Sequence, residues 1–149
     1  MRTHTIGGQA HELAAQGREF DRLMQKHYSA RGAFNEVPIR ARTGKYRRLD
    51  TYDPVEKEII SRKSFAASNG QLAFADKDDV IGYLQEFALK YRNGAVVPKV
   101  PSAGSLAGKT IVGRYVLEIP PQNYPVPPFV LEQAKIRGII IRDALGRTL

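Results

Sequence analysis

The feature that most constrains the fold is a short turn, DPVEK at residues 53–57, between two stretches of strand-like composition. Proline at the second position of this segment is typical of a β-turn. The stretches on either side, Lys45–Tyr52 and Glu58–Phe65, contain β-branched and aromatic residues that favour strands. We therefore expect a β-hairpin at the centre of the fold.

The length of this turn decides which side chains of the hairpin meet. A four-residue turn places Asp50 opposite Ser61, whereas a turn one residue shorter or longer makes Asp50 face Glu58 and Arg62 instead. Residues two apart in a strand share a face, so Ser61 and Lys63 point the same way. In the first register an acid, a hydroxyl and an amine converge, and the sequence alone leaves the register open.

The remaining segments predict one mixed sheet flanked by helices. Hydrophobic spacing predicts helices over about 9–30, 76–93 and 128–137, and strands over Phe34–Arg40, 109–119 and 139–143. Three sequential strands favour an antiparallel meander, and the strand–helix–strand ending favours a parallel crossover. The fold class is therefore α/β or α+β, with the element order αβββαβαβ.

Length and composition indicate a single domain. A chain of 149 residues buries enough surface for one core, so we expect one domain over residues 1–149, with a flexible N-terminus at 1–8 and a long loop at 95–108. No apolar run reaches the length of a membrane helix, and no apolar signal segment starts the chain, which predicts a soluble protein without a membrane span. The absence of cysteine excludes disulfides and thiolate metal sites.

Positive charge is concentrated around the expected hairpin. The formal net charge is +8, and eight of the 23 lysines and arginines lie between Arg40 and Lys63. A basic domain of this kind favours a polyanionic partner, whether nucleic acid, anionic lipid or an acidic protein.

Ala103–Thr110, AGSLAGKT, matches a relaxed phosphate-loop pattern. A phosphate loop needs a helix directly after it, because the helix N-terminus helps to hold the phosphates. Here the following segment, TIVGRYVLEI, has strand-like composition. A loop is therefore favoured over a nucleotide site.

The residues of the hairpin also resemble a known nuclease signature. Asp50, then Ser61-Arg62-Lys63, then Gln71-Leu72 resemble the PD-(D/E)xK pattern of the restriction-endonuclease-like fold. The strings GKYRRLDTYDPVEKEIISRKS, EFALKYRNGA and LEIPPQNYPVPPFVLEQAKIRGIIIRD are similar to restriction-endonuclease-fold toxin domains at the C-termini of bacterial polymorphic toxins, including contact-dependent inhibition toxins. This similarity spans roughly residues 33–147.

The resemblance implies a metal-dependent endonuclease that hydrolyses phosphodiester bonds. Ser61 occupies the place of the usual acid, as it does in some similar toxins, so a divalent ion (Mg²⁺, Mn²⁺ or Zn²⁺) is expected on Asp50 and Glu36. Glu58 or an acid of the first helix such as Glu19 are alternatives to Glu36. The expected roles of the remaining site residues are water activation or charge stabilisation by Lys63, hydrogen bonding to water or phosphate by Ser61, a carbonyl ligand from Arg62, and orientation by Gln71.

The basic residues are expected to grip phosphates beside the scissile bond, and they are Arg40, Arg42, Lys45, Arg47, Arg48 and Arg62. Apart from Tyr46 and Tyr52, no aromatic platform for unpaired bases stands out, which favours duplex DNA, with tRNA as the alternative substrate. The resemblance further implies delivery into the cytoplasm of a target cell as the C-terminal part of a larger toxin, and a cognate immunity protein. A non-catalytic basic module that binds nucleic acid or an acidic protein, and a toxin-like domain disabled at Ser61, are the other interpretations.

Overall fold

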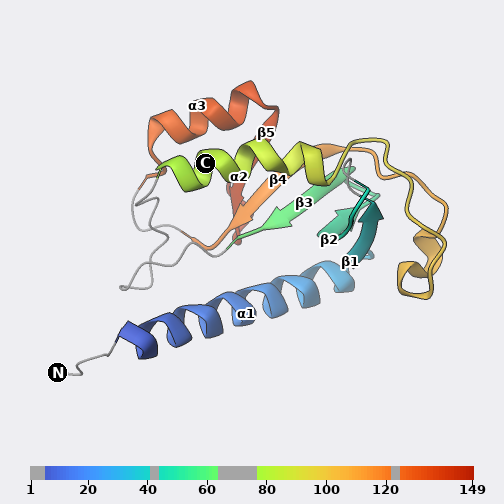
Figure 1. The fold of residues 1–149 in the computed structure, drawn as a ribbon, viewed down its shortest axis with the longest axis horizontal. Coiled ribbons are helices and arrows are strands. Elements are labelled where there is room, and N and C mark those ends of the chain that lie inside the picture. The colour runs from blue at the N-terminus through green and yellow to red at the C-terminus, as the bar shows by residue number, and fades with distance from the viewer. Residues whose placement is uncertain (1–5, 41–43, 64–76, 122–124) are drawn as a thin grey trace.

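A computed structural model describes residues 6–40, 44–63, 77–121 and 125–149. Along the chain its elements are α1 (Ile6–Ala30), β1 (Phe34–Arg40), β2 (Tyr46–Asp53), β3 (Glu58–Arg62), α2 (Lys77–Lys90), the 3-10 helix η1 (Pro101–Leu106), β4 (Arg114–Ile119), α3 (Pro128–Ile136) and β5 (Ile139–Asp143) (Figure 1). The expected order is confirmed, with η1 added in the segment expected to be a loop. Because α1 begins at Ile6, residues 6–8 belong to the helix and not to a flexible N-terminus.

In the described part of the chain the strands form one sheet in the order β1-β2-β3-β4-β5. The pairs β1–β2 and β2–β3 are antiparallel, and β3–β4 and β4–β5 are parallel. The meander and the parallel crossover are therefore both confirmed.

The β2–β3 turn has the four-residue length that places Asp50 opposite Ser61. Asp53 pairs with Glu58, Tyr52 with Ile59 and Thr51 with Ile60, and the next step of this register sets Asp50 opposite Ser61. The turn is fixed by its own first residue, since Oδ1 of Asp53 accepts hydrogen bonds from the backbone amides of Val55 and Glu56, each at 3.0 Å. A side chain that caps a turn in this way favours one turn length, which selects the register that the sequence left open.

Helices cover both faces of the sheet, α1 on one side and α2 with α3 on the other (Figure 1). Met24 and Tyr28 of α1 pack against Ile60 and Val116. The larger apolar cluster lies on the opposite face, where Leu84 and Phe87 of α2 and Val130 of α3 pack against Ile59, Leu117 and Ile141. Ile59 and Ile60 thus enter different layers, as strand alternation requires. No helix in the described ranges is long and apolar enough to cross a membrane.

Alternation fails at one place, between β1 and β2. Leu49 belongs to the apolar layer beneath α2, whereas Thr51, two residues on, lies opposite Ile60 and bonds Asn35 on the α1 side. The regular pairing is interrupted at the same point, and Glu36 has a positive φ of 53°. A non-glycine residue in this conformation is strained. The hairpin therefore kinks where Glu36 and Asp50 lie side by side.

The packing predicts a large loss of stability on truncating Leu117 in β4. Its side chain is 0% exposed, whereas Leu145, in the turn after β5, is 68% exposed. Leu117→Ala leaves a cavity and should lower the free energy of unfolding by about 3 kcal/mol. Leu145→Ala is the matched control and should change it by less than about 0.5 kcal/mol. Urea denaturation of both variants checks this, and equal losses would contradict the described core.

Candidate active site

The site lies at the carboxyl end of β3, where Asp50 is held against the neighbouring strand. Oδ2 of Asp50 accepts a hydrogen bond of 2.7 Å from the backbone amide of Arg62. Ligand sites of sheets with parallel strands are usual at this end of the strands. Asp50 and Ser61 are therefore brought together, as the four-residue turn predicts.

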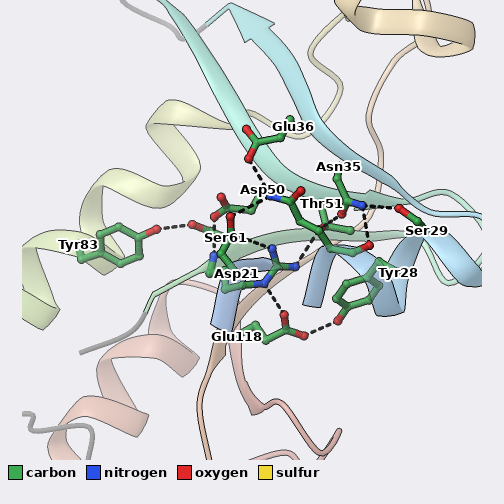
Figure 2. Close-up of polar contacts among 12 residues, drawn as sticks. Asp21, Tyr28, Ser29, Asn35, Glu36, Asp50, Thr51, Ser61, Tyr83 and Glu118 are labelled. Carbon is green, nitrogen blue, oxygen red and sulfur yellow. Dashed lines mark hydrogen bonds and ion pairs between the residues drawn. The ribbon is translucent and has the colours of Figure 1, made fainter. Parts of the chain in front are cut away.

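Lys63 follows directly after β3 and reaches the same region as Ser61 through a shared aromatic residue. The ammonium Nζ of Lys63 lies 4.7 Å from the ring centroid of Tyr83, on α2. The hydroxyl of Tyr83 is hydrogen-bonded to the hydroxyl of Ser61 (Figure 2). Asp50, Ser61 and Lys63 thus lie on the α2 side of the sheet. Ser61 is buried, and its hydroxyl is hydrogen-bonded to that of Tyr83. The hydrogen-bond partner of Ser61 in this structure is therefore a protein group and not solvent.

Two further acids adjoin Asp50, one from the kinked strand and one from α1. Nε2 of Gln25 donates to Oε1 of Glu36 at 2.9 Å and to Oδ2 of Asp21 at 2.8 Å. Figure 2 shows Glu36, Asp50 and Asp21 around one region. The amide of Gln25 therefore separates two carboxylates that would otherwise repel each other.

The carboxylates of Asp21 and Glu36 both repel that of Asp50. Burial raises the pKa of Asp50 to about 6, and the repulsion of Asp21 and Glu36 adds to this, although the amide and the positive charge of Arg62 oppose it. A carboxyl group shifted toward neutrality by burial and like charges is typical of functional sites. Burial therefore disfavours the charged form of Asp50 at neutral pH.

The structure decides among the acids expected to support Asp50. Glu36 adjoins it, as expected. Glu58 is wrong as an alternative, because it lies at the other end of β3, where Arg142 and Arg114 bind its carboxylate. Glu19 is also wrong, since it is exposed and paired with Arg22, and Asp21 is the acid of α1 that reaches the site.

Arg62 does not face a substrate, and the expectation that it grips phosphate is wrong. Its side chain is only 2% exposed and lies on the α1 side of the sheet. Its guanidinium donates to Glu118 at 2.8 Å, to Asp21 at 2.7 Å and to Thr51 at 2.8 Å. Burial lowers the pKa of Arg62, but the charge and hydrogen bond of Glu118 and the contact with Asp21 raise it overall. Arg62 thus stays positively charged inside the protein, where its side chain links β3 to α1 and β4.

A chain of buried polar groups continues from Arg62 beneath α1. The other carboxylate oxygen of Glu118 accepts from the Tyr28 hydroxyl, which in turn accepts from Arg142 at 3.1 Å. Arg142 binds both carboxylate oxygens of Glu58. Burial raises the pKa of Tyr28, and the neighbouring Glu118 raises it further, so that the hydroxyl stays protonated. Fully bonded networks of this kind fix one arrangement of their members.

The remaining basic residues lie on the β1–β2 hairpin. Arg40, Lys45, Arg47 and Arg48 are exposed, as phosphate contacts require. Of the expected aromatic residues, Tyr46 is exposed, whereas Tyr52 is buried with its hydroxyl on Val112. Arg42 and Gln71 lie outside the described residues.

In the described ranges, no three histidine, cysteine, aspartate or glutamate side chains are arranged to hold a metal ion. The all-oxygen donor pair of Asp50 and Glu36 nevertheless suits a hard cation. Mg²⁺ is commonly bound by one or two carboxylates, with water and substrate phosphate completing its shell. Burial is the main cause of the raised pKa of Asp50, and a cation there would stabilise its charged form.

Comparison with known proteins gives no independent guide to function. No family model matches the chain, and no curated protein or solved structure matches it. What the chain does must therefore be argued from the site itself.

The raised pKa of Asp50 predicts a pH-dependent effect of Asp50→Asn in metal-free buffer. The folded protein holds this proton up to about pH 6, against an ordinary pKa of 3.8, so the group favours folding at low pH and loses that contribution as the pH rises through 6. Asparagine keeps the acceptor for the Arg62 amide. Asp50→Asn should therefore match the wild type near pH 4 and exceed its free energy of unfolding by up to about 3 kcal/mol at pH 7.5.

Urea denaturation in EDTA at the two pH values measures this difference. Glu132→Gln, on the exposed side of α3, is the control and should follow the wild-type profile. A difference for Asp50→Asn that does not grow with pH would contradict the described burial.

The buried ion pair predicts a second contrast in stability. Arg62→Met leaves Glu118 and Asp21 without their cation and should cost about 3–5 kcal/mol. Arg22→Met removes an arginine that is 61% exposed and paired with Glu19, and should cost less than about 1 kcal/mol. Adding Glu118→Gln to Arg62→Met should recover part of the loss, because no unpaired charge then remains on β4. Denaturant unfolding tests all three variants. Similar losses of stability in Arg62→Met and Arg22→Met would refute the role of Arg62 as a buried structural residue.

Proposed function

We propose that this chain is a metal-dependent endonuclease that hydrolyses phosphodiester bonds, with DNA as the preferred substrate and tRNA as the alternative. The observation that carries the proposal is the position of Asp50, hydrogen-bonded to Arg62 opposite Ser61, on the same side of the sheet as Lys63. Arg47 and Arg48, two of the exposed basic residues of the β1–β2 hairpin, precede Asp50 on β2. A purely structural hairpin would need neither the strained backbone at Glu36 nor the buried carboxyl group of Asp50.

A divalent ion on Asp50 and Glu36 would neutralise charge at the attacked phosphate and acidify water there. Lys63 then has the role of stabilising charge that develops on the phosphate. An ammonium about 4 Å from a phosphate oxygen contributes roughly 4 kcal/mol at an effective dielectric constant near 20. The Tyr83 ring helps to hold that ammonium near the site by a cation–π contact.

Arg40, Lys45, Arg47 and Arg48 would bind the flanking phosphates, a contact that sets position and not sequence. Within this proposal the nuclease is a toxin delivered into a target cell, and a cognate immunity protein would neutralise it by binding the basic hairpin. This part rests on the resemblance of the hairpin and C-terminal segments to polymorphic toxin domains.

A second candidate function is a basic module that binds nucleic acid without cleaving it. The observation that favours it is the lack, in the described residues, of a ready three-ligand metal group. Both functions predict salt-sensitive binding to nucleic acid, and cleavage separates them.

Cleavage of plasmid DNA or total tRNA with Mg²⁺, Mn²⁺ or Zn²⁺ tests the nuclease. The purified chain should nick or fragment one of these substrates, and EDTA should abolish the reaction. Lys63→Ala and Asp50→Asn should each lower the rate by about 100-fold or more, because each removes a group that acts on the transition state.

Lys135→Ala is the matched control, since Lys135 is exposed on α3, which packs against β5 at the other edge of the sheet. It should retain full activity. Binding without cleavage in any of the three metals would exclude the nuclease and favour the binding module. Equal cleavage by Lys63→Ala and the wild type would show that the activity comes from another source.

A further inference from the structure

A groove of about 460 Å³ lies on the basic hairpin, at the end of the sheet. Its lining is formed by Pro38 of β1, Tyr46, Arg47 and Arg48 of β2, Val100 directly before η1, and Ser102 within η1. No acidic side chain is among the described residues that line it. The groove thus combines apolar walls with two arginines and one aromatic ring, a composition that the phosphate contacts of the proposed function alone do not require.

Tyr46 is the unusual member of this lining. Its side chain is 53% exposed, although an aromatic ring of this size is normally buried in a core. Arg40, its direct cross-strand partner, holds it in place: the guanidinium lies 5.0 Å from the ring centroid and donates a hydrogen bond of 2.6 Å to the hydroxyl. One face of the ring is thus stacked on a cation, and the ring is fixed in an exposed position without joining the core.

The groove is connected to the candidate active site along β2. Tyr46 lies four residues before Asp50, which is about 13 Å along a strand. Between them, the hydroxyl of Tyr91 donates to the carbonyl of Arg48 at 3.0 Å, and Tyr91 is close enough to Arg47 and Asp50 for both to affect its pKa. A nucleic-acid strand that follows β2 would therefore pass from the groove to the acids.

We propose that this groove binds one unpaired nucleotide of the substrate, with its base stacked on Tyr46 and its phosphate on Arg47 and Arg48. The inference rests on the proposed function in taking nucleic acid as the ligand. It goes further by naming the form of the substrate, and it replaces the expected duplex with an unpaired segment because Tyr46 is exposed. Base stacking on an exposed aromatic ring, beside arginines that track the backbone, is how proteins hold single strands.

The stacking geometry separates an unpaired base from a duplex. In a duplex both faces of each internal base are already stacked on neighbouring bases. Tyr46 can therefore stack only on a base that has left the double helix or that lies in a single-stranded segment. Phosphate contacts by Arg47 and Arg48 are available to either form. The substrate class is therefore nucleic acid with an unpaired segment next to the scissile bond, such as a loop, a frayed end or a single strand.

Fluorescence anisotropy in EDTA tests the groove without cleavage. The probes are a labelled short single-stranded DNA, the RNA of the same sequence, and the DNA annealed to its complement. The wild type should bind the single strands more tightly than the duplex. Tyr46→Ala should weaken single-strand binding by about 5- to 100-fold and change duplex binding by less than about twofold.

Two controls make the result specific. Tyr46→Phe keeps the ring and should bind within about twofold of the wild type, whereas Tyr46→Leu keeps bulk on the strand and should behave as Tyr46→Ala does. Arg48→Ala should weaken the single strand and the duplex alike, because both present phosphates. Circular dichroism confirms that each variant is folded.

Equal affinity of the wild type for single strand and duplex would overturn the proposal, as would equal losses on both probes in Tyr46→Ala. A preference shared by the DNA and RNA single strands supports stacking, whereas tight binding of only one of them shows that the sugar, and not the base, is recognised. The failure of the nuclease proposal is distinguishable: the chain would then bind single strands through Tyr46 but cleave nothing. Conversely, intact cleavage of plasmid DNA with no effect of Tyr46→Ala on binding would leave the nuclease standing and remove the groove.

Discussion

The arrangement of the site depends on one residue, Arg62, which binds in two directions. Its backbone amide holds the carboxylate of Asp50 on the α2 side of the sheet, and its guanidinium holds Asp21 and Glu118 on the α1 side. Because the side chain is almost fully buried, these bonds are strong, and an unpaired member would be costly. One residue therefore fixes the helix, the sheet and the candidate catalytic acid relative to one another.

Local backbone strain at Glu36 also shapes the site. The positive φ of Glu36 and the break in strand alternation mark the point of the hairpin where the carboxylates of Glu36 and Asp50 adjoin. Burial and repulsion then raise the pKa of Asp50 to about 6. Each of these features lowers the stability of the fold, and strained or electrostatically unfavourable groups are retained mainly where function needs them.

The sequence predicts the hairpin and its neighbours well, because local chemistry decides them. Asp53 caps its own turn, and this sets Asp50 opposite Ser61 without help from distant residues. The role of Arg62 is not predictable in this way, since spacing of two assigns it to the face opposite Ser61 but does not show that α1 covers that face. Asp21 and Tyr83 are contributed by helices far along the chain, so only tertiary packing brings them to the site.

The charges of the site constrain the order in which its ligands can bind. Asp21 and Glu36 each repel the carboxylate of Asp50, and the three acids would also repel a phosphodiester. Under the proposed function, Lys63 and the arginines of the hairpin would attract the phosphate, which would reach the acids only when protons or cations neutralise them. Above pH 6, therefore, cation binding and nucleic-acid binding should each strengthen the other, as thermodynamic linkage requires. Under the proposed function, the carboxylates that weaken the fold would thus be the groups that make binding of the cation and of the nucleic acid interdependent.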